Sequence, residues 1–511
     1  MNAMLALDFA AAAGVALLPE ALAKPRASLR RLPLAFALHV AAIGFICTCL
    51  VLLTGRVRFA AFVAIALVAL LAGVSNAKYT SLREPFVFTD LSLFSQLFAH
   101  PRLYLPFLSA GTVAAIVLGA VVVVAAFLAD APLPHRPTGA LLLAAGACLS
   151  AAYACAARLP LTLHAADDQR RHGFFAVLIA YLLNGMRPAT ARQLRAALAA
   201  GPFAKGMPMT APDVILIQSE SFFDARRLSL AIDPSILRNF DTARRESVQH
   251  GELTVPAWGA NTMRTEFAVL TGADQDRLGY ARFYPYAFVR RASMSLASWF
   301  KRGGYQTLAI HPYYADFFGR ARAFRHLQID RFVDIEAFAD APRAGPYVAD
   351  MAVAGAIIDA LDETRADPAF IFSMTMENHG PLHLETVQAG ESTAFHSLGD
   401  AAQWRDLTAY LRHLANADAM LGRLLAALRA RRRETVLCFY GDHVPALSHV
   451  YAALGKEPAC SDYFIWRNYG DASATREDLS AGQLGVALVK ALAPAIPGET
   501  PARSLHTTEE R

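Results

Sequence analysis

Asp213-Val-Ile-Leu-Ile-Gln-Ser-Glu220 is an apolar run that turns polar at its end. This pattern predicts a buried strand whose last side chains leave the sheet. Four later runs show the same pattern, and amphipathic helical stretches alternate with them. The later runs are Tyr305–Ile310, Ala369–Met374, Thr435–Tyr440 and Tyr463–Trp466, and the helical stretches cover about 293–303, 348–364, 403–432 and 480–492. The alternation predicts an α/β domain with a mainly parallel sheet covered on both faces.

Polar residues that follow these strands are the candidates for a site, because open α/β sheets bind ligands beyond the carboxyl ends of their strands. They are Glu220, His311, the triplet Glu377-Asn-His379 and the pair Asp442-His443. Gly441 lets both side chains of the pair leave the sheet edge towards one point. Carboxylate oxygen and imidazole nitrogen together suit Mn²⁺, Zn²⁺ or Mg²⁺. We therefore predict a divalent metal site, with helix caps or satisfied buried polar groups as the alternative.

Thr262 lies in the stretch Val255-Pro-Ala-Trp-Gly-Ala-Asn-Thr-Met-Arg-Thr-Glu-Phe-Ala-Val-Leu-Thr-Gly272, a glycine-containing turn that runs into a predicted helix. One interpretation makes it a helix N-cap, with Thr265 and Glu266 as capping partners. The other makes it a nucleophile. An alcohol is almost wholly protonated at neutral pH, but coordination to a divalent cation lowers its pKa. The N–H groups at the helix start would stabilise an arriving phosphoryl group, so this interpretation predicts attack on phosphorus.

The first third of the chain carries most of the apolar excess. Hydrophobic residues make up 55% of the 511 residues and the mean hydropathy is +0.31, which is high for a soluble enzyme. Four runs are long and apolar enough to span a membrane, at about 33–53, 57–77, 104–129 and 138–157. A fifth candidate, about 3–22, is weakened by Asp8 and Glu20. These runs predict a transmembrane domain of four to five helices over residues 1–160.

Two further segments are expected near the membrane surface. Residues 76–98 interleave aromatic and polar side chains, as in an amphipathic segment lying in the interface. The run 174–183 is too short to span, and we expect it at the interface or packed on the soluble domain. The expected plan is completed by a linker with an interfacial helix, a catalytic domain and a disordered tail, over residues 161–204, 205–495 and 496–511.

Charge and cysteine content exclude some classes of protein. A net charge of +5 is small for this length and does not suggest a nucleic-acid binder. Four of the six cysteines sit in apolar runs and no CxxC motif occurs, so a structural zinc site built on thiolates is not expected. The two remaining cysteines, Cys438 and Cys460, leave the question of a disulfide open.

Four motifs of this chain resemble the lipoteichoic acid synthase and phosphoglycerol transferase family, which belongs to the alkaline phosphatase/sulfatase superfamily. The motifs are Gln218-Ser-Glu-Ser-Phe222, Ala260-Asn-Thr-Met-Arg-Thr-Glu-Phe267 with Leu270-Thr-Gly272, Glu377-Asn-His379 and Tyr440-Gly-Asp-His443. They cover about residues 210–470 in matching order, and the multi-span anchor before them also fits the family's plan.

The resemblance implies roles for eight residues. The metal ligands would be Glu220, Thr262, Asp442 and His443, with Thr262 also the nucleophile. His379 would contact the phosphate, and His311, Phe318 and Arg320 resemble the segment that holds glycerol phosphate. Phe318 stands where the family is expected to have a tryptophan, so the match is looser there. Arg320 would clamp an anion, because guanidinium geometry suits phosphate.

The resemblance also implies the reaction. Thr262 would attack the phosphorus of a phosphatidylglycerol headgroup and release diacylglycerol. An acceptor hydroxyl would then take phosphoglycerol from the phospho-threonine, while His379 and Arg320 stabilise the developing charge. The cofactor would be one divalent ion, with Mn²⁺ preferred over Zn²⁺ or Mg²⁺. The acceptor would be an envelope glycan or polyglycerolphosphate, and the Ala- and Arg-rich composition favours a Gram-negative relative that acts on a glycan.

Two alternatives stay open at this point. Phosphoethanolamine transferases of the same superfamily share the anchor, the threonine and the metal. A membrane-tethered binding protein with a degenerate domain is the non-catalytic alternative. Sulfatases themselves are disfavoured, because Asn261-Thr-Met-Arg264 lacks the Cys or Ser setting that formylglycine requires.

Charge counting and the resemblance disagree about orientation. Five spans with the N-terminus inside place the catalytic domain outside, together with the basic loop Lys24–Arg31. The positive-inside rule disfavours that position for the loop and favours a cytoplasmic catalytic domain. The resemblance implies the opposite, a multi-pass protein of the bacterial inner membrane with the catalytic domain on the periplasmic or extracellular side.

Overall fold

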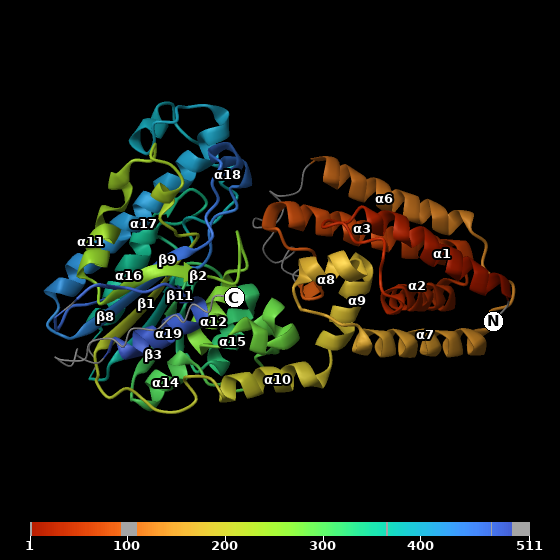
Figure 1. Cartoon of the computed structure of the whole chain (residues 1–511), viewed down its shortest axis with the longest axis horizontal. Helices are drawn as coiled ribbons and strands as arrows, with labels where there is room; N and C mark the ends of the chain where they lie inside the picture. The colour runs from red at the N-terminus through yellow and green to blue at the C-terminus, as the bar shows by residue number, and fades with distance from the viewer. Residues whose placement is uncertain (1–2, 93–109, 364–365, 472, 493–511) are drawn as a thin grey trace, which may run out of the picture.

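The computed structural model describes residues 3–92, 110–363, 366–471 and 473–492, which form a helical bundle and an α/β domain (Figure 1). The bundle contains α1 (Ala3–Ala21), α2 (Pro33–Thr54), α3 (Val57–Leu82), α6 (Ala110–Ala129) and α7 (Thr138–Arg158). Three short helices connect the two parts, namely α8 (Ala165–His172), α9 (Phe174–Gly185) and α10 (Pro188–Ala199). The expected tail 496–511 and the start of the expected span 104–129 lie outside the described residues.

Three helices of the described bundle, α2, α3 and α7, are long and apolar enough to cross a membrane, with mean hydropathy values of 2.5, 2.5 and 1.9. A helix satisfies its own backbone hydrogen bonds, which is what a segment in hydrocarbon requires. Within α6, the apolar stretch Val113–Ala129 is shorter than these three helices. The prediction of an N-terminal helical membrane domain before an α/β domain is confirmed.

The α/β domain is built on a nine-stranded sheet in the order β10-β2-β9-β8-β1-β7-β3-β4, with β11 paired to β2. The strands are β1 (Asp213–Ser219), β2 (Gln249–Thr254), β3 (Gln306–Ile310), β4 (Arg331–Val333), β7 (Ala369–Met374), β8 (Thr435–Gly441), β9 (Ser461–Arg467), β10 (Thr475–Arg476) and β11 (Leu479–Ser480). A separate hairpin joins β5 (Arg343–Ala344) to β6 (Tyr347–Val348).

The centre of the sheet is parallel, as predicted. Strand β1 pairs in parallel with both β7 and β8, and β3 pairs in parallel with β7 and β4. Strand β9 runs antiparallel to β8 and to β2, so the run Tyr463–Trp466 belongs to an antiparallel flank. All five predicted strands are present, and β2 is an addition whose polar composition gave no strand signal.

Helices cover both faces because the central strands bury both of their faces. On β1, Val214 and Leu216 join one core, whereas Ile215 and Ile217 join the other. The helices of the domain are α11 (Arg238–Glu246), α12 (Thr262–Thr271), α13 (Pro285–Phe288), α14 (Leu296–Arg302), α15 (Arg320–His326), α16 (Asp350–Asp362), α17 (Arg405–Ala430), α18 (Ser448–Leu454) and α19 (Ala481–Lys490). Apolar residues of α11, α16 and α17 pack on the face of Ile215 and Ile217, and those of α12, α14 and α19 pack on the face of Val214 and Leu216.

The cysteines form no disulfide. All six are free, including Cys438 inside β8 and Cys460 just before β9. Cys438 is in register with Ile465, so Cys460 lies five residues, or roughly 16 Å, further along the partner strand. Disulfide geometry requires Cα atoms within about 7 Å of each other, which this register does not allow.

The bundle and the α/β domain meet in a packed junction. Helix α9 is buried along its length, and its Tyr181 ring lies 5.0 Å from the Phe283 ring of the α/β domain. Residues 76–82 continue α3, and Phe86 and Phe88 are buried in the same cluster as Phe283. The described part of this segment, residues 76–92, therefore contributes buried side chains to the protein core, where we expected a surface segment, and residues 93–98 lie outside the described residues.

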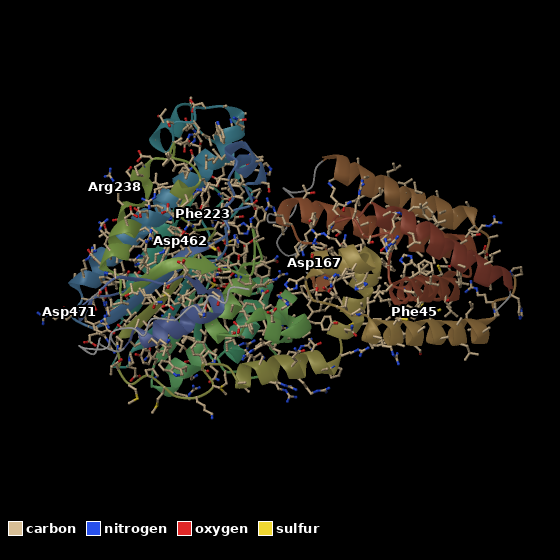
Figure 2. All side chains as sticks on the ribbon, in the orientation of Figure 1. Phe45, Asp167, Phe223, Arg238, Asp462 and Asp471 are labelled. Carbon is tan, nitrogen blue, oxygen red and sulfur yellow. The ribbon has the colours of Figure 1, made fainter. Side chains whose placement is uncertain are left out.

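A pocket of about 270 Å³ lies at this junction. Its bundle side includes Glu84 and Asp167, and its domain side includes Arg264 and Arg282. Figure 2 shows Asp167 between the two parts. The junction thus contains charged groups from both parts as well as the apolar cluster.

Candidate active site

The ends of β1 and β8 bring the predicted residues together. These strands are parallel neighbours in which Ser219 is in register with Gly441, so Glu220 and Asp442 leave the sheet at the same level. Position 441 requires glycine, because a Cβ there would lie 1.8 Å from the Phe222 carbonyl oxygen. The strand pairing therefore creates the site.

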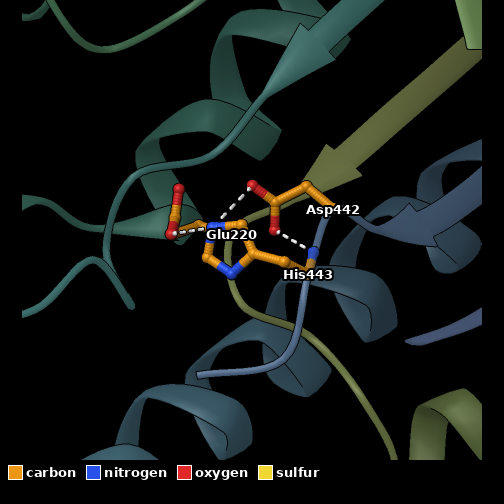
Figure 3. Close-up of side chains that lie close together, drawn as sticks. All are labelled: Glu220, Asp442 and His443. Carbon is orange, nitrogen blue, oxygen red and sulfur yellow. Dashed lines mark hydrogen bonds and ion pairs between the residues drawn. The ribbon is translucent and has the colours of Figure 1, made fainter. Parts of the chain in front are cut away.

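Glu220, Asp442 and His443 form a buried cluster whose ligand atoms all lie within 4.8 Å of one another (Figure 3). His443 Nε2 is 3.5 Å from Glu220 Oε1 and 3.5 Å from Asp442 Oδ2. Thr262 Oγ1 is 3.4 Å from the same nitrogen. Among the described residues, no second group of three such side chains has this geometry. The structure thus brings all four predicted ligands to one point.

The donor set fits a divalent cation. Asp442 Oδ1 accepts hydrogen bonds from the backbone N–H groups of Ser221 and His443, at 2.8 Å each. Asp442 Oδ2 is buried and has no hydrogen-bond partner. A buried carboxylate oxygen without a donor is costly unless a cation faces it. Two carboxylates, an imidazole and a hydroxyl suit Zn²⁺ or Mn²⁺.

Neighbouring groups fix the direction of each ligand. His443 Nδ1 lies 3.2 Å from the Val444 carbonyl oxygen. Since a carbonyl only accepts, Nδ1 carries the hydrogen and Nε2 presents its lone pair to the cluster. The Thr265 hydroxyl donates to the Asp442 carbonyl oxygen at 2.7 Å, which ties α12 to the end of β8.

The electrostatics of the cluster also favour a cation. Burial and the nearby Asp442 carboxylate raise the pKa of Glu220 to about 8. Two carboxylates held close together away from water cannot both ionise easily. A divalent cation between them would remove this conflict and keep both ionised.

Thr262 is the first residue of α12, and the N-cap interpretation is wrong. The cap position belongs to Asn261, which has a left-handed backbone with φ 66° and makes no side-chain cap bond. Thr265 instead holds Asp442, and Glu266 binds Arg320. Thr262 is partly exposed, and the first N–H groups of a helix have no intrahelical acceptor. The threonine therefore stands at an anion-stabilising helix start, open to a substrate.

Arg320 is fully buried and held by one carboxylate. Its Nη2 donates to Glu266 Oε2 at 2.9 Å, and its Nε lies 3.2 Å from both Glu266 oxygens. Its Nη1 lies 3.3 Å from His311 Nε2. The Phe318 ring centroid is 5.2 Å from the guanidinium carbon, within cation–π range. His311, Phe318 and Arg320 thus form one group, in which Nη1 is the side of the guanidinium turned away from Glu266.

The surroundings of the two candidate histidines, His311 and His379, favour the neutral imidazole. Burial, and then the charge of Arg320, lower the pKa of His311. Burial also lowers the pKa of His379, whose Nδ1 lies 2.7 Å from the Gly380 carbonyl oxygen. That contact places the hydrogen on Nδ1 and leaves Nε2 as an acceptor in the neutral ring.

Glu377, from the predicted Glu377-Asn-His379 motif, supports the site without joining it. Its Oε1 accepts from His413 Nδ1 at 2.8 Å and from Asn416 Nδ2 at 2.6 Å, both on α17. Its Oε2 accepts the Asp350 N–H at 2.7 Å. Glu377 therefore fixes the loop that carries His379 to helices α16 and α17.

Several supporting residues were not predicted in their observed roles. Ser221 and Glu266 lie inside motifs that the sequence marks, but their partners are 221 and 54 positions away along the chain. His413 and Glu84 lie in segments with no chemical motif. Thr375 is not part of any motif in the sequence either, although its hydroxyl oxygen accepts a hydrogen bond from the Glu220 N–H at 3.0 Å. Long-range contacts of this kind leave no local pattern.

Fold and site together define an α/β domain with a candidate metal centre and a hydroxyl at its strand ends. The family model described as Sulfatase matches residues 212–490. This chain belongs to the sulfatase family, as the resemblance to the alkaline phosphatase/sulfatase superfamily predicted.

Two Rhizobium meliloti proteins are similar to this chain in sequence. A capsular polysaccharide biosynthesis protein is 30% identical over 419 residues, which is 77% of this chain and 74% of that protein. A putative cyclic beta-1,2-glucan modification protein is 32% identical over 247 residues, or 48% of this chain. The second match spans 37% of that relative's length.

A solved structure shares the arrangement of both parts. The integral membrane lipooligosaccharide phosphoethanolamine transferase A of Neisseria meningitidis aligns with a TM-score of 0.55 at 13% identity. The alignment covers 89% of this chain and 87% of that one, so the shared fold extends across the helical bundle and the α/β domain.

Replacing Asp442 by Asn should remove the metal while keeping the fold. Asn retains an oxygen for the two backbone N–H donors and loses the negative charge at Oδ2. We expect the purified full-length chain to bind about one divalent ion and the Asp442→Asn chain to bind at least 10-fold less, measured by elemental analysis after dialysis. Asp418→Asn, a buried aspartate that holds Asn239, is the matched control and should keep its ion. Equal metal content in wild type and Asp442→Asn would contradict this assignment.

The His413 network predicts a specific pH dependence of stability. Burial alone would lower the pKa of His413, but hydrogen bonds to Glu377 and Glu385 outweigh it and raise the pKa to about 9. The contribution of His413 is therefore complete below about pH 6.5, the unfolded value, and is lost as the pH rises through about 9. The Tm difference between wild type and His413→Gln should shrink from pH 6 to pH 10 by several degrees. His383→Gln, at an exposed histidine, should give a pH-independent difference, and a pH-independent difference for His413→Gln would refute the network's role.

Proposed function

We propose that this chain is a membrane-anchored, metal-dependent phosphoglycerol transferase with Thr262 as its nucleophile. The carrying observation is the position of Thr262 Oγ1, 3.4 Å from His443 Nε2 at the start of α12, beside two buried carboxylates. A structural threonine has no reason to point into a buried acidic cluster. A hydroxyl at a metal centre and a helix start suits nucleophilic attack on phosphorus.

In the first step the Thr262 oxygen attacks the phosphorus of a phosphatidylglycerol headgroup. The bond from phosphorus to the diacylglycerol oxygen breaks, the proton given up by the Thr262 hydroxyl is transferred to that oxygen, and diacylglycerol leaves. A bound divalent ion would lower the pKa of the threonine hydroxyl and offset the charge on phosphorus. Glu220, Asp442 and His443 would hold that ion, with Mn²⁺ as our first choice and Zn²⁺ or Mg²⁺ as alternatives. The N–H groups at the start of α12 would stabilise the phosphoryl oxygens.

In the second step an acceptor hydroxyl attacks the phospho-threonine and restores Thr262. His379 is neutral with Nε2 free of hydrogen, so it can accept the proton of that hydroxyl or receive one to contact the phosphate. Arg320 contributes positive charge to the site, and its Nη1 is directed towards His311 and away from Glu266. His311, Phe318 and Arg320 then line the place for the glycerol phosphate group.

The acceptor is proposed to be an envelope glycan. The names of both Rhizobium relatives refer to carbohydrates, one to a capsular polysaccharide and one to a cyclic beta-1,2-glucan. A glycan offers the hydroxyl that the second step needs. Polyglycerolphosphate remains the other acceptor in this scheme, and the two are separated by which product carries the label from phosphatidylglycerol.

We place the catalytic domain on the outer face of the inner membrane of a bacterium. The basic loop 24–31 lies on the catalytic side, because Ser28 N donates to the Arg170 carbonyl of α8 at 2.7 Å. One of its charges is neutralised, since Arg31 pairs with buried Glu20 at 2.8 Å. This reduces the charge conflict without removing it. A C-terminal alkaline phosphatase fusion should be active. Activity only in a fusion to a cytoplasmic reporter would contradict the proposed orientation.

Replacing the nucleophile tests the proposal directly. With labelled phosphatidylglycerol and the full-length chain in detergent, Thr262→Ala should reduce diacylglycerol release by about 10³-fold or more. Thr262→Ser should retain measurable activity because it keeps a hydroxyl. Thr271→Ala removes a hydroxyl from the same helix, where it donates to Phe267 O at 2.6 Å, and should leave the rate within a few-fold of wild type.

The same assay separates the alternatives. Faster release from phosphatidylethanolamine than from phosphatidylglycerol would favour a phosphoethanolamine transferase. Full activity of Thr262→Ala would exclude Thr262 as the nucleophile. No turnover of either lipid by a metal-loaded chain would support the non-catalytic binding protein.

A further inference from the structure

The segment after α3 reaches from the membrane bundle to the nucleophile turn. Glu84 Oε1 accepts a hydrogen bond from Arg264 Nη1 at 2.9 Å, and Glu84 Oε2 accepts one from Arg264 Nη2 at 3.1 Å. Asn261 Nδ2 donates to Glu84 Oε2 at 3.3 Å. One carboxylate of the anchor thus binds two residues that bracket Thr262 in the sequence.

Both partners of Glu84 flank Thr262 at the start of α12. Asn261 has the left-handed backbone conformation, φ 66°, that turns the chain into α12. Arg264 is buried in the first turn of that helix, and its Nε also donates to the Phe283 carbonyl oxygen at 3.1 Å. Non-glycine residues in the left-handed region persist only where their surroundings hold them. Glu84 supplies part of that support from outside the α/β domain.

The bundle holds Glu84 rigidly in turn. Lys78 on α3 lies 3.3 Å from Glu84 Oε2 and 2.6 Å from Asp90 Oδ2. Asp90 Oδ2 also accepts the Val87 N–H at 2.8 Å, and Phe86 N donates to Ser75 Oγ at 3.1 Å. Burial would raise the pKa of Glu84, but the charges of Arg264 and Lys78 outweigh it and lower the pKa to about 2. Glu84 is therefore ionised throughout the working pH range.

A second contact of the same segment serves as an internal comparison. The neighbouring Arg83 lies over the Trp258 ring, 4.3 Å from its centroid, and pairs with Glu457. The Arg83–Glu457 pair also joins the bundle to the α/β domain, but its two side chains are exposed and neither residue flanks Thr262 in the sequence. Comparing variants of the two ion pairs therefore separates contacts that only hold the bundle against the α/β domain from contacts that also position Thr262.

We propose that Glu84 is a positioning residue for Thr262, provided by the membrane anchor through Asn261 and Arg264. This inference rests on the proposed function, since it takes Thr262 to be the nucleophile. It implies that the membrane bundle completes the catalytic geometry in addition to tethering the domain. A residue that sets the direction of a nucleophile acts mainly on turnover, because small displacements of a reacting atom slow the chemical step.

The test uses the full-length chain in detergent with bis(para-nitrophenyl) phosphate, a soluble phosphodiester that does not require a lipid site. Glu84→Gln should lower kcat by about 10- to 100-fold, with KM, metal content and Tm close to wild type. Glu457→Gln, the matched control, should keep kcat within about twofold, since surface ion pairs contribute little. Purely structural adhesion predicts instead a lower Tm for Glu84→Gln with kcat retained.

Asn261→Gly keeps the proposal falsifiable if Glu84→Gln proves unstable, because it leaves Glu84 in place and should still lower kcat while retaining the wild-type Tm. Asn261→Gly preserves the left-handed backbone and removes only the amide contact, so kcat should fall less than in Glu84→Gln. The double variant Glu84→Gln/Arg264→Gln should lose less kcat than the product of the two single losses, because both changes break the same Glu84–Arg264 ion pair.

The outcomes separate this inference from the proposed function. Wild-type kcat in Glu84→Gln, or equal losses in Glu84→Gln and Glu457→Gln, would overturn the positioning role. If Thr262→Ala is inactive in the same experiment, the proposed function survives that result. If Thr262→Ala is fully active, the proposed function fails and this inference fails with it.

Discussion

The parallel pairing of β1 with β8 is the interaction on which the rest of the site depends. Its register sets Glu220 beside Asp442, and His443 follows in the next position. Burial, and then repulsion from the Asp442 carboxylate, raise the pKa of Glu220 to about 8. The strand pairing therefore holds two carboxylates in a repulsive arrangement that a divalent cation would relieve. The Asp442 Oδ2 atom, which has no hydrogen-bond partner, marks where that cation would lie.

Helix α12 and the membrane bundle are both connected to this site. Helix α12 brings the Thr262 hydroxyl to the cluster, and Thr265 ties the same helix to the end of β8. On the next turn Glu266 holds the buried Arg320. The membrane bundle reaches the first turn of α12 through Glu84. A lipid donor has its scissile bond at the membrane surface, so this direct connection between anchor and nucleophile is consistent with the proposed chemistry.

Local patterns in the sequence predicted the strands, their polar ends and the fold class. Apolar runs such as Asp213–Ser219 read clearly because both faces of a central parallel strand are buried. Strand β2, Gln249–Thr254, was missed because it is polar and only partly buried. The capping role of Thr265 and Glu266 was predicted wrongly, since both side chains have long-range partners that outcompete a local bond. The contact of Glu84 with Arg264 spans 180 positions, and no periodicity encodes such a pair.

The central claim is that phosphorus passes through Thr262, and a covalent intermediate tests it most directly. The full-length, metal-loaded chain would be mixed with phosphatidylglycerol without acceptor, quenched in acid, digested and analysed by mass spectrometry. The account predicts one phosphoglycerol group on the peptide that contains Thr262, and its loss when an acceptor glycan is added before the quench. Diacylglycerol release with no modified peptide, or with the group on a different residue, would contradict the account.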